Sequence, residues 1–474
     1  MAERRTRAAA GRAADRLDVW LDGAHAGTLV RDRGGDVTFA YTPSYQALRS
    51  APSLSVSMPR HVAEHGADVA MPWIDNLLPD NDTVRARWAA QFDERRPTAF
   101  NLLRHMGADC AGAVQVVPAG EEPRDGAGAR PLGTREIAAH LRELRADDAS
   151  WAFEHHGGRF SLGGQQGKFA LARAADGSWH QPTGRGASTH IFKIGVDGIA
   201  HSAAAELVTM RAARALGLPV AAVESAWFED QAAVVVERFD RLVTRDGGAR
   251  RLHQEDMCQA LGLWRSAKYE ADGGPGVRDL ARLVARAVDR RDLARSRDDL
   301  ARTVVFNWVA AGTDAHAKNL ALLHVGARTA LAPLYDLVSA SLLWPADEIR
   351  FKGRLAMKLG GEYRLRALGP RHVERAATDL GVDGGWLADV AAAYAAAWPD
   401  AVRDAVAHER TLVPADVAGE FVDRAAARAA DVVRALGASG GGAAPAPAPG
   451  ATWVPAHERS GRAVAGHWRA RPGR

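Results

Sequence analysis

Apolar and polar residues alternate between Leu17 and Thr42, and Asp-Gly and Gly-Gly pairs interrupt the alternation. This pattern predicts a meander of three short β-strands, because alternate side chains of a strand face opposite sides of a sheet and such glycine pairs favour tight turns. Residues 72–118 change to helical spacing through WIDNLLPDN, VRARWAAQF and FNLLRHMG, and they close on the strand-like AVQVVP. We therefore expect a small sheet followed by helices.

The middle of the chain is predicted to form strands around one helix. A glycine-, proline- and charge-rich stretch at 119–133 predicts a linker, and a capped helix follows from Thr134. Strand patterns return between residues 157 and 240, interrupted by one helical segment that stops at Gly217, just before Pro219. Strands with one helix between them predict an α+β layer.

From Asp256 onward the pattern is mostly helical. It is broken by the glycine-rich YEADGGPG at 269–276 and by a predicted pair of strands around 319–332. The stretch from residue 438 holds SGGGAAPAPAPG and then arginine-rich sequence with little periodicity, which is typical of a disordered tail. The fold class expected from this order is α+β, with a mostly helical C-terminal part.

Composition and charge narrow the class of protein. Of 474 residues, 47% are hydrophobic and 25% are charged, which is typical of a globular protein with two or three domains. The two cysteines, Cys110 and Cys258, lack metal-ligand spacing, so we expect neither a disulfide framework nor a zinc module. We expect a cytoplasmic location, where cysteines stay reduced. A net charge of +4 does not by itself indicate nucleic-acid binding. No apolar run reaches the roughly 20 residues of a membrane span.

Lysine is scarce, with six lysines among 61 basic residues. Because arginine stands wherever either cation would serve, each lysine is a candidate for a position that needs a compact ammonium group. The six are Lys168, Lys193, Lys268, Lys318, Lys352 and Lys358.

A glycine-rich turn lies between two strand patterns in GRFSLGGQQGKFAL at 158–171. The backbone N–H groups of such a turn can approach an anion closely. It is not a Walker A loop, because the glycine spacing is one residue short and Phe169 replaces the required serine or threonine. An ordinary hairpin is the alternative, and the scarce Lys168 favours an anion site. The candidate residues of this loop are Gly163, Gly164, Gln165 and Lys168.

Two further strand features suggest nucleotide contacts. In THIFKIG, Lys193 points to the opposite face from Phe192 and Ile194, as a strand lysine that pairs with nucleotide phosphates would. A solvent-facing strand residue is the alternative. In VVVERFDR, an apolar strand leads into Glu237 and Phe239, which resembles a hinge that contacts adenine through backbone groups.

The strongest candidate is TDAHAKN followed by LYD. Asp314 and Asn319 have the D-x-x-x-x-N spacing of a kinase catalytic loop, in which the aspartate accepts a hydroxyl proton and the asparagine holds a metal ion. Asp336 would supply a second oxygen ligand of the kind that Mg²⁺ prefers. This spacing also arises by chance, but the order of glycine loop, strand lysine, hinge, DxxxxN and late aspartate favours a kinase. His316 and Lys318 of the same loop are assigned to nucleotide binding.

Histidine-based chemistry is a weaker interpretation. His316 lies beside Asp314, and His155 and His156 precede the glycine loop, but no HxH or HExxH spacing with a third ligand occurs. No G-x-S-x-G elbow lies between a strand pattern and a helix pattern either, which disfavours an α/β-hydrolase.

With these motifs the chain resembles the HipA toxins of bacterial toxin–antitoxin systems. The resemblance rests on SLGGQQGKFAL, THIFKIG, VERFDR, HQEDMCQALG, SAKYEADGGPG, TDAHAKN and LYDLVSA in this order, and VWLDGAHAGTL and WIDNLLPD match the family's N-terminal subdomain. It covers residues 17–436. The expected organisation is a disordered basic tail at 1–16, the N-terminal subdomain at 17–118, a linker and helix at 119–150, a kinase-like N-lobe at 151–252, a helical C-lobe at 253–436 and a disordered tail at 437–474.

The resemblance implies a two-lobed serine/threonine protein kinase that uses ATP and Mg²⁺. By motif, Asp314 is the catalytic base, and Asn319 and Asp336 hold Mg²⁺. The residues implied in ATP binding are Gly163, Gly164, Gln165, Lys168, Lys193, Glu237, Phe239, His316 and Lys318.

Ser161 matches a serine that such kinases autophosphorylate, which ejects the glycine loop and silences the enzyme. A phosphate there adds about −1.5 to −2 charges beside the site that must hold the phosphates of ATP. Gly167 stands where the family has an acidic residue, and we expect this glycine to loosen the loop.

The resemblance also implies partners. Family members arrest growth by phosphorylating glutamyl-tRNA synthetase, so an aminoacyl-tRNA synthetase is the expected substrate. They pair with a helix-turn-helix antitoxin of the HipB type, through which they contact operator DNA. Two rival functions stay open: a small-molecule phosphotransferase that uses the same site, and a non-catalytic partner of a DNA-bound antitoxin. The presence of Asp314, Asn319 and Asp336 argues against the second.

Overall fold

The computed structural model describes residues 15–123, 129–151, 161–183, 186–244, 249–409 and 412–437, together with four short strands between 452 and 469. The chain divides into two compact units, and each unit collects separate segments of sequence. We call them the first and the second unit. The first holds residues up to Gly198 with Ala226–Lys268 and Leu320–Ala332, and the second holds Ile199–Ser225, Tyr269–Asn319 and the residues from Pro333 onward. Both units therefore combine residues from either side of the lobe boundary predicted at residue 252.

The predicted N-terminal meander is present in the first unit and is extended at both edges. β1 (Arg16–Leu21), β2 (Ala24–Arg31) and β3 (Val37–Tyr41) pair antiparallel in chain order, with β4 (Glu64–His65) beside β3 and β5 (Val114–Pro118) beside β1. Leu17, Val19 and Leu21 are buried in alternation, as a half-buried strand requires. The helices of this region are α2 (Pro43–Gln46), α3 (Ala67–Asn76), α4 (Asp82–Gln91) and α5 (Ala99–Met106).

A larger sheet of the described residues has the strand order β10-β11-β9-β7-β8-β6. Its strands are β6 (Ala129–Leu132), β7 (Lys168–Arg173), β8 (Trp179–Pro182), β9 (His190–Lys193), β10 (Val223–Phe228) and β11 (Gln231–Glu237). β6 lies in the stretch predicted as a linker, and Pro131 is tolerated there because β6 is an edge strand. The predicted capped helix is α6 (Thr134–Ala146), where the Gly133 N–H donates to Glu136 Oε2 at 3.0 Å.

The register of this sheet determines which residues share a face. Lys168 of β7 lies opposite Lys193 of β9, and Lys193 lies opposite Val234 of β11. The adjacent pair, Phe169 and Phe192, stacks with ring centroids 4.8 Å apart and belongs to the hydrophobic core. Because successive side chains of a strand alternate, the two lysines lie on the face opposite this aromatic pair.

Two smaller sheets complete the first unit. β14 (His253–Asp256), β15 (Ala321–Val325) and β16 (Arg328–Leu331) pair antiparallel, which confirms the strand pair predicted around 319–332 and adds a third strand from a distant segment. β12 (Arg241–Val243) pairs with β13 (Ala249–Arg251). The short helices here are α8 (Met257–Leu261) and the 3₁₀ turn η1 (Arg265–Ala267).

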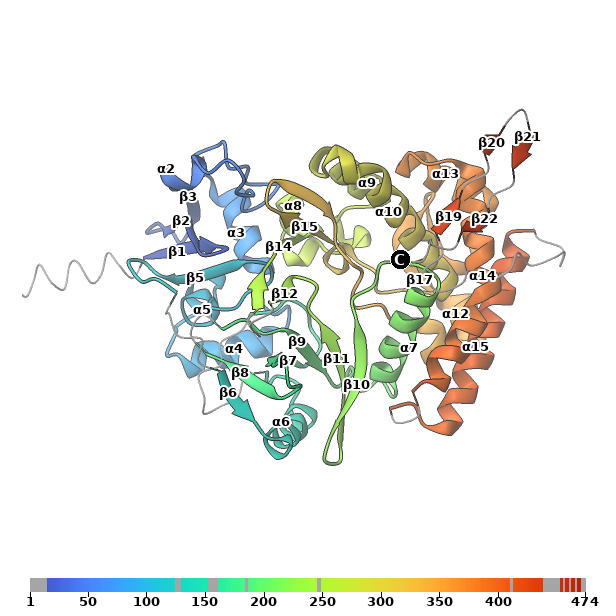
Figure 1. Ribbon diagram of the computed structural model, residues 1–474, viewed down its shortest axis with the longest axis horizontal. Helices are drawn as coiled ribbons and strands as arrows, with labels where there is room; N and C mark the ends of the chain where they lie inside the picture. Colours follow the sequence, from blue (N-terminus) through green and yellow to red (C-terminus); the bar gives the residue numbers. More distant parts are fainter. Residues whose placement is uncertain are drawn as a thin grey trace, which may run out of the picture. The chain divides into compact units, whose positions relative to one another are not determined.

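The second unit is mostly helical (Figure 1), and α14 (Gly384–Ala407) is the helix against which several of its other helices pack. α7 (Ser202–Ala215), α10 (Arg290–Ala310), α13 (Pro370–Leu380) and α15 (Ala415–Ala435) all pack against α14. Trp398 and Phe306 meet edge to face in this core, with centroids 5.7 Å apart. The remaining helical elements are α9 (Val277–Ala287), α11 (Ala340–Leu343), α12 (Ala346–Lys352), η2 (Glu270–Asp272), η3 (Ala317–Asn319) and η4 (Leu365–Ala367).

A hairpin in this helical unit was not expected from the sequence. β17 (Arg354–Leu359) pairs with β18 (Glu362–Arg364) across Gly360 and Gly361, which both have positive φ. That Gly-Gly pair is an ordinary hairpin signal, since glycine adopts positive φ without steric cost. Helices and sheets together confirm the predicted α+β class.

The predicted tails are described only in part. Within 437–474 the structure assigns β19 (Thr452–Val454), β20 (His457–Arg459), β21 (Arg462–Val464) and β22 (His467–Arg469), with β19 paired to β22 and β20 paired to β21. The rest of that stretch from residue 438, and the N-terminal stretch through residue 14, lie outside the described residues. In the part of the chain that was searched, no helix is both long and apolar enough to span a bilayer.

Candidate functional site

The DxxxxN motif forms a compact series of turns after α10. The helix stops because Ala311 takes a left-handed conformation, with φ of 55°, and the next N–H, that of Gly312, donates to Asn307 O at 2.7 Å. A Cβ on Gly312 would lie 2.6 Å from Asn307 Oδ1, so a larger residue here would displace the Asn307 side chain. Further turns follow, in which His316 N donates to Asp314 O at 2.8 Å.

Asp314 and Asn319 are brought together by this loop. Asn319 Nδ2 donates to Asp314 O at 2.9 Å, and Asn319 N donates to His316 O at 2.9 Å. The amide nitrogen of Asn319 is therefore engaged with the backbone, and the amide oxygen is the atom that could serve as a cation ligand. The side chain of Asp314 is exposed, whereas His316, Lys318 and Asn319 are buried.

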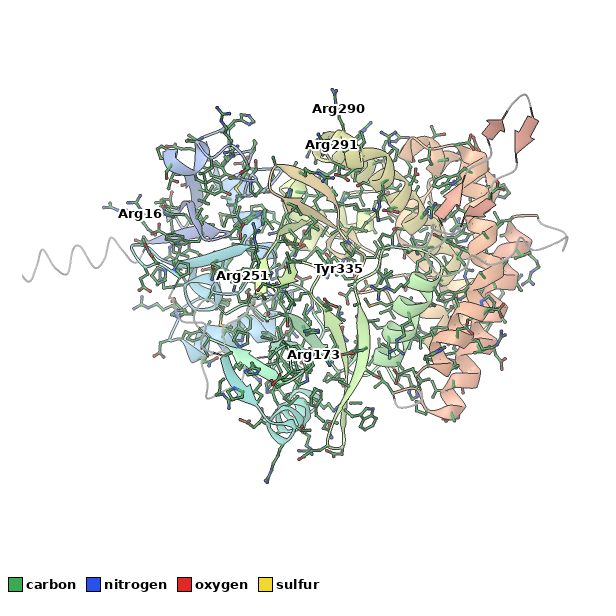
Figure 2. All side chains as sticks on the ribbon, in the orientation of Figure 1. Arg16, Arg173, Arg251, Arg290, Arg291 and Tyr335 are labelled. Atoms are coloured by element: carbon green, nitrogen blue, oxygen red, sulfur yellow. The ribbon has the colours of Figure 1, made fainter. Side chains whose placement is uncertain are left out.

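Tyr335 joins the downstream aspartate to the same loop. The Oη of Tyr335, which is labelled in Figure 2, donates to Lys318 O at 2.6 Å, so the residue before Asp336 contacts the residue before Asn319. Asp336 itself has φ of 59°, a left-handed conformation that aspartate tolerates better than most residues but that still costs free energy. Backbone strain of this kind occurs both in turns and at functional sites, and the same conformation is found at Asp22 and Asp93.

The donors of this loop fit a magnesium ion that shares its ligands with a nucleotide. Among the described residues no group of three or more His, Cys, Asp or Glu side chains is arranged as a metal site. Mg²⁺ commonly binds through one or two protein oxygens and completes its shell with phosphates and water. One carboxylate from Asp336 and one amide oxygen from Asn319 match that requirement.

Ser161 is held inside the first unit. Its side chain is 0% exposed, its N–H donates to Asp109 O at 2.9 Å, and its Oγ donates to Leu77 O at 2.7 Å. Residues 158–160 of the predicted loop lie outside the described residues. The hydroxyl predicted to be phosphorylated is therefore buried and engaged in this conformation.

The glycine loop lies directly against Lys168. Gly164 has φ of 101°, a conformation that glycine adopts without steric cost, and a Cβ at this residue would lie 2.5 Å from Lys168 Nζ, so the ammonium lies close to the loop backbone. The ammonium also lies 5.3 Å from the ring centroid of Trp151. Gly163 is half-buried and Gln165 is exposed.

Gly167 packs closely rather than standing free. It is buried, and a Cβ there would lie 3.2 Å from both Asp148 O and Leu144 Cδ1. A Cβ here would require Asp148 O and the Leu144 side chain to shift by a few tenths of an ångström, so the glycine fits close packing against α6.

Asp80 contacts the loop from the WIDNLLPD motif, a role that the sequence did not reveal. Its N–H donates to Gly164 O at 2.8 Å, and its carboxylate pairs with Lys268 Nζ at 3.0 Å. The scarcity of lysine was the signal in the sequence for this contact, because it indicated Lys268 as a candidate position without indicating its partner.

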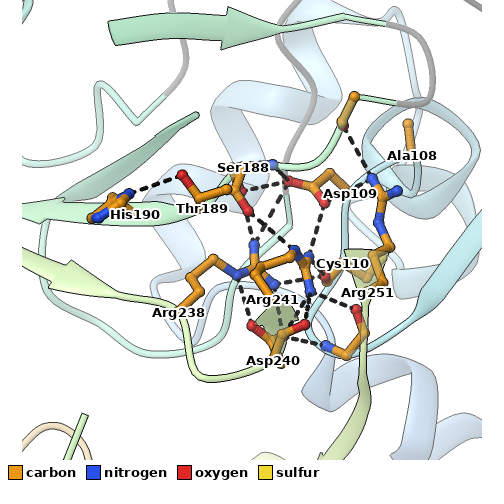
Figure 3. A network of polar contacts seen from close by, with 12 residues as sticks. Ala108, Asp109, Cys110, Ser188, Thr189, His190, Arg238, Asp240, Arg241 and Arg251 are labelled. Carbon is orange, nitrogen blue, oxygen red and sulfur yellow. Dashed lines mark hydrogen bonds and ion pairs between the residues drawn. The ribbon is translucent and has the colours of Figure 1, made fainter. Parts of the chain in front are cut away.

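The predicted hinge places its two named residues on either side of a buried arginine. Glu237 is exposed at the end of β11 and Phe239 is half-buried, whereas Arg238 between them is buried. Arg238 Nε donates to Asp240 Oδ1 at 3.0 Å and its Nη2 donates to Cys110 O at 2.9 Å (Figure 3). The backbone of the hinge is thus tied to the segment that precedes β5.

Asp109 is the central acceptor of this network. Its carboxylate accepts from Arg241 Nη2 at 2.9 Å, from Arg251 Nη2 at 3.0 Å and from Ser188 Oγ at 2.6 Å (Figure 3). Burial raises the pKa of Asp109, but the attraction of Arg241, Arg251 and Arg238 outweighs it and holds that pKa below its ordinary value. Because the Asp109 carbonyl also accepts from Ser161, one residue contacts both the hinge and the glycine loop.

Comparison with known proteins gives consistent matches. Residues 160–408 match the HipA-like C-terminal domain and residues 17–117 match the HipA N-terminal domain. The chain is 33% identical over 375 residues to a Sinorhizobium fredii protein named "Putative kinase Y4mE", which covers 77% of this chain and 86% of that protein. It is 31% identical over 360 residues to the serine/threonine-protein kinase toxin HipA of Shewanella oneidensis, covering 73% of this chain and 79% of the toxin.

The fold is also similar to a solved structure. The chain superposes on HipA from the Shewanella oneidensis complex of HipA, HipB and operator DNA with a TM-score of 0.75 and 26% identity. The match covers 89% of this chain and 97% of that one.

Proposed function

This chain belongs to the HipA family of protein kinase toxins, and on that premise we propose the residues and partners with which it acts. Asp314 is the catalytic base, which accepts the proton of a serine or threonine hydroxyl as that oxygen attacks. A positioned base of this kind typically contributes about 10²- to 10⁴-fold in rate. The exposed carboxylate of Asp314, at the start of an ordered loop, supports this role.

Asn319 and Asp336 hold Mg²⁺ in this proposal. Bound Mg-ATP supplies the phosphoryl group and the charge neutralisation that transfer needs. The observation that carries the proposal is the pair of hydrogen bonds that organise this loop, from Asn319 Nδ2 to Asp314 O and from Tyr335 Oη to Lys318 O. Together they support a single constellation of base and ligands within the second unit.

Nucleotide contacts are proposed for residues of both units. In the first unit, the register that puts Lys168 and Lys193 on one face, beside the glycine loop, supports binding of phosphates. The residues proposed there are Gly163, Gly164, Gln165, Lys168 and Lys193, with Glu237 and Phe239 as the adenine hinge. His316 and Lys318, in the second unit, are likewise proposed as nucleotide contacts.

Ser161 is proposed as an inhibitory autophosphorylation site. Its hydroxyl donates to a carbonyl oxygen, and a phosphate in the same place would repel that oxygen and have no room. Modification therefore requires the loop to leave the position described above, and it would prevent the return. Mass spectrometry of Ser161 after incubation with Mg-ATP tests this proposal.

We propose a HipB-like helix-turn-helix antitoxin as the partner, with operator DNA contacted mainly through it. The similar Shewanella oneidensis HipA, solved in complex with HipB and operator DNA, supports this. The family resemblance supports an aminoacyl-tRNA synthetase, glutamyl-tRNA synthetase by preference, as the protein substrate.

The first prediction tests the catalytic base. Asp314→Ala should lower the transfer of labelled phosphate from ATP to proteins of a bacterial lysate by at least about 100-fold, because the base is lost. Its melting temperature should stay unchanged, because the side chain is exposed and contributes little to packing. Asp347→Ala, which removes an exposed carboxylate of the same unit, serves as the control and should keep full activity.

Two results would contradict the proposal. Transfer by Asp314→Ala at the rate of the unmodified chain would exclude Asp314 as the base. Label recovered only in the small-molecule fraction would favour a small-molecule phosphotransferase over the proposed protein substrate.

A further inference from the structure

Tyr269 contacts the proposed catalytic base from a segment that the family motifs do not assign to catalysis. Its Oη donates a hydrogen bond to Asp314 Oδ1 at 2.5 Å. Both residues belong to the second unit, so the contact is internal to one compact body. Its ring also meets the ring of His316 edge to face, with centroids 4.9 Å apart. The phenol therefore contacts two residues of the catalytic loop.

The backbone around Tyr269 is fixed by a tight turn. Tyr269 O accepts from Asp272 N at 3.1 Å and from Gly274 N at 2.9 Å. Gly273, with φ of 85°, allows the chain to reverse there. These hydrogen bonds fix the position of the Tyr269 backbone.

The next residue anchors this turn to the hairpin. The Glu270 carboxylate accepts from Lys358 N at 2.6 Å and pairs with Lys358 Nζ at 3.4 Å. A Cβ on Gly276 would lie 3.0 Å from Glu270 Cδ, so glycine at this position leaves room for the carboxylate. The turn and the Glu270 anchor therefore fix the backbone from which the Tyr269 side chain extends.

Within the described residues, the Tyr269 bond is the one hydrogen bond found for the Asp314 carboxylate. A carboxylate held by one oxygen has little freedom to rotate, so the other oxygen keeps a constant direction. We propose that Tyr269 is a positioning residue, which holds Asp314 by Oδ1 so that Oδ2 receives the proton of the attacking hydroxyl. The proposal rests on the proposed role of Asp314 as the base.

Tyr269→Phe tests this directly, because it keeps the ring beside His316 and removes the donor. A hydrogen bond to a charged group, lost where geometry matters, corresponds to about a tenfold fall in rate. We expect the apparent kcat for transfer of labelled phosphate from ATP to lysate proteins to fall about tenfold. The KM for ATP and the melting temperature should not change, since the phenol contacts the base and the loop and is not needed for packing.

Tyr394→Phe is the matched control. It removes a buried phenol hydroxyl from α14 of the same unit, which lies outside the catalytic loop. Its rate should equal that of the unmodified chain. As a second variant, Glu270→Gln weakens the anchor and should lower the same apparent kcat by a smaller factor.

A double variant separates the two proposals. If Tyr269 acts through Asp314, adding Tyr269→Phe to Asp314→Asn should not reduce the residual rate further. An inactive Asp314→Asn together with a fully active Tyr269→Phe would overturn the proposed role of Tyr269 and leave that of Asp314 intact. A rise in the KM of Tyr269→Phe for ATP at unchanged kcat would have the same meaning. A fully active Asp314→Asn would overturn the proposed base, and the role of Tyr269 with it.

Discussion

At the scale of single residues, burial determines the ionisation of several histidines. His253 is 3% exposed, and its Nε2 lies 3.0 Å from Leu54 O. Its ring stacks on that of His324 with centroids 5.1 Å apart. Burial, and then the neighbouring His324, lower the pKa of His253 from 6.5 to about 3. The folded chain therefore keeps this ring neutral where the unfolded chain would protonate it.

The second prediction follows from that difference. Because the folded pKa is lowered, the contribution of His253 to stability is fully present above pH 6.5 and is lost as the pH falls from 6.5 toward about 3. It amounts to a loss of about 2 kcal/mol at pH 5. His253→Phe should therefore show a shallower fall in the free energy of unfolding between pH 7 and pH 5, measured by denaturant titration. The exposed His61→Phe is the control, and equal slopes in both variants would contradict the assignment.

The third prediction concerns the charge of Asp336. Asp336→Asn keeps an oxygen ligand and a residue that tolerates positive φ, so it changes the charge more than the backbone. A neutral ligand holds a hard cation less well, so we expect ATP affinity measured with Mg²⁺ to fall about tenfold. Affinity measured without Mg²⁺ should not change. Calorimetric titration of ATP with and without Mg²⁺ provides the measurement. If Mg²⁺ strengthens ATP binding equally in the unmodified chain and in Asp336→Asn, Asp336 does not belong to the site.

At the scale of elements, strand register gives the lysines their environment. Lys168 and Lys193 are each 5% exposed, and they lie opposite one another in β7 and β9. Lys268 forms an ion pair with Asp80 beside the glycine loop, and Lys358 forms one with Glu270 in the Tyr269 turn. Lys352 is exposed on α12, where arginine would serve equally. The scarcity of lysine therefore indicated structural anchors as well as candidate phosphate contacts.

The fourth prediction uses this contrast. Lys193→Arg should weaken ATP binding by at least about tenfold, because a planar guanidinium does not replace a compact ammonium at a buried position. Lys352→Arg makes the same chemical change at an exposed position and should leave affinity unchanged. Equal affinities for both variants in a nucleotide titration would remove Lys193 from the proposed site.

At the scale of the first unit, charged side chains connect segments that lie far apart in the sequence. Asp109 precedes β5, whereas Arg241 and Arg251 follow the hinge, and their buried ion pairs join these regions. Buried pairs of this kind are costly to break, because removing one partner leaves a buried charge without compensation. The network therefore couples the integrity of the N-terminal region to the geometry of the hinge.

The fifth prediction tests that coupling. Asp109→Ala should lower the free energy of unfolding by about 3–5 kcal/mol, because Arg241 and Arg251 lose their shared carboxylate. Asp400→Ala breaks an exposed pair with Arg403 on α14 and should cost about 1 kcal/mol or less. Denaturant unfolding of both variants provides the measurement, and equal losses would show that the network does not stabilise the fold.

Local patterns were enough to find most elements and the candidate loop. The meander, the helices of the second unit and the strands that carry Lys168 and Lys193 follow from periodicities of 2 and 3.6, which depend only on neighbouring residues. The spacing of Asp314 and Asn319 is likewise local, because five residues form one set of turns. The β17–β18 hairpin and β6 were missed although Gly360-Gly361 carried a signal for the first.

Contacts between distant segments depended on the packed chain. Nothing in the sequence indicated that Tyr269 would reach Asp314, that Tyr335 would reach Lys318, or that Ser161 would be buried with its hydroxyl on Leu77 O. The physical reason is that periodicity determines which face of an element is apolar, whereas strand register and helix packing determine which residues of separate elements meet. The types of residue in the candidate site were therefore readable from the sequence, and their partners only from the tertiary structure.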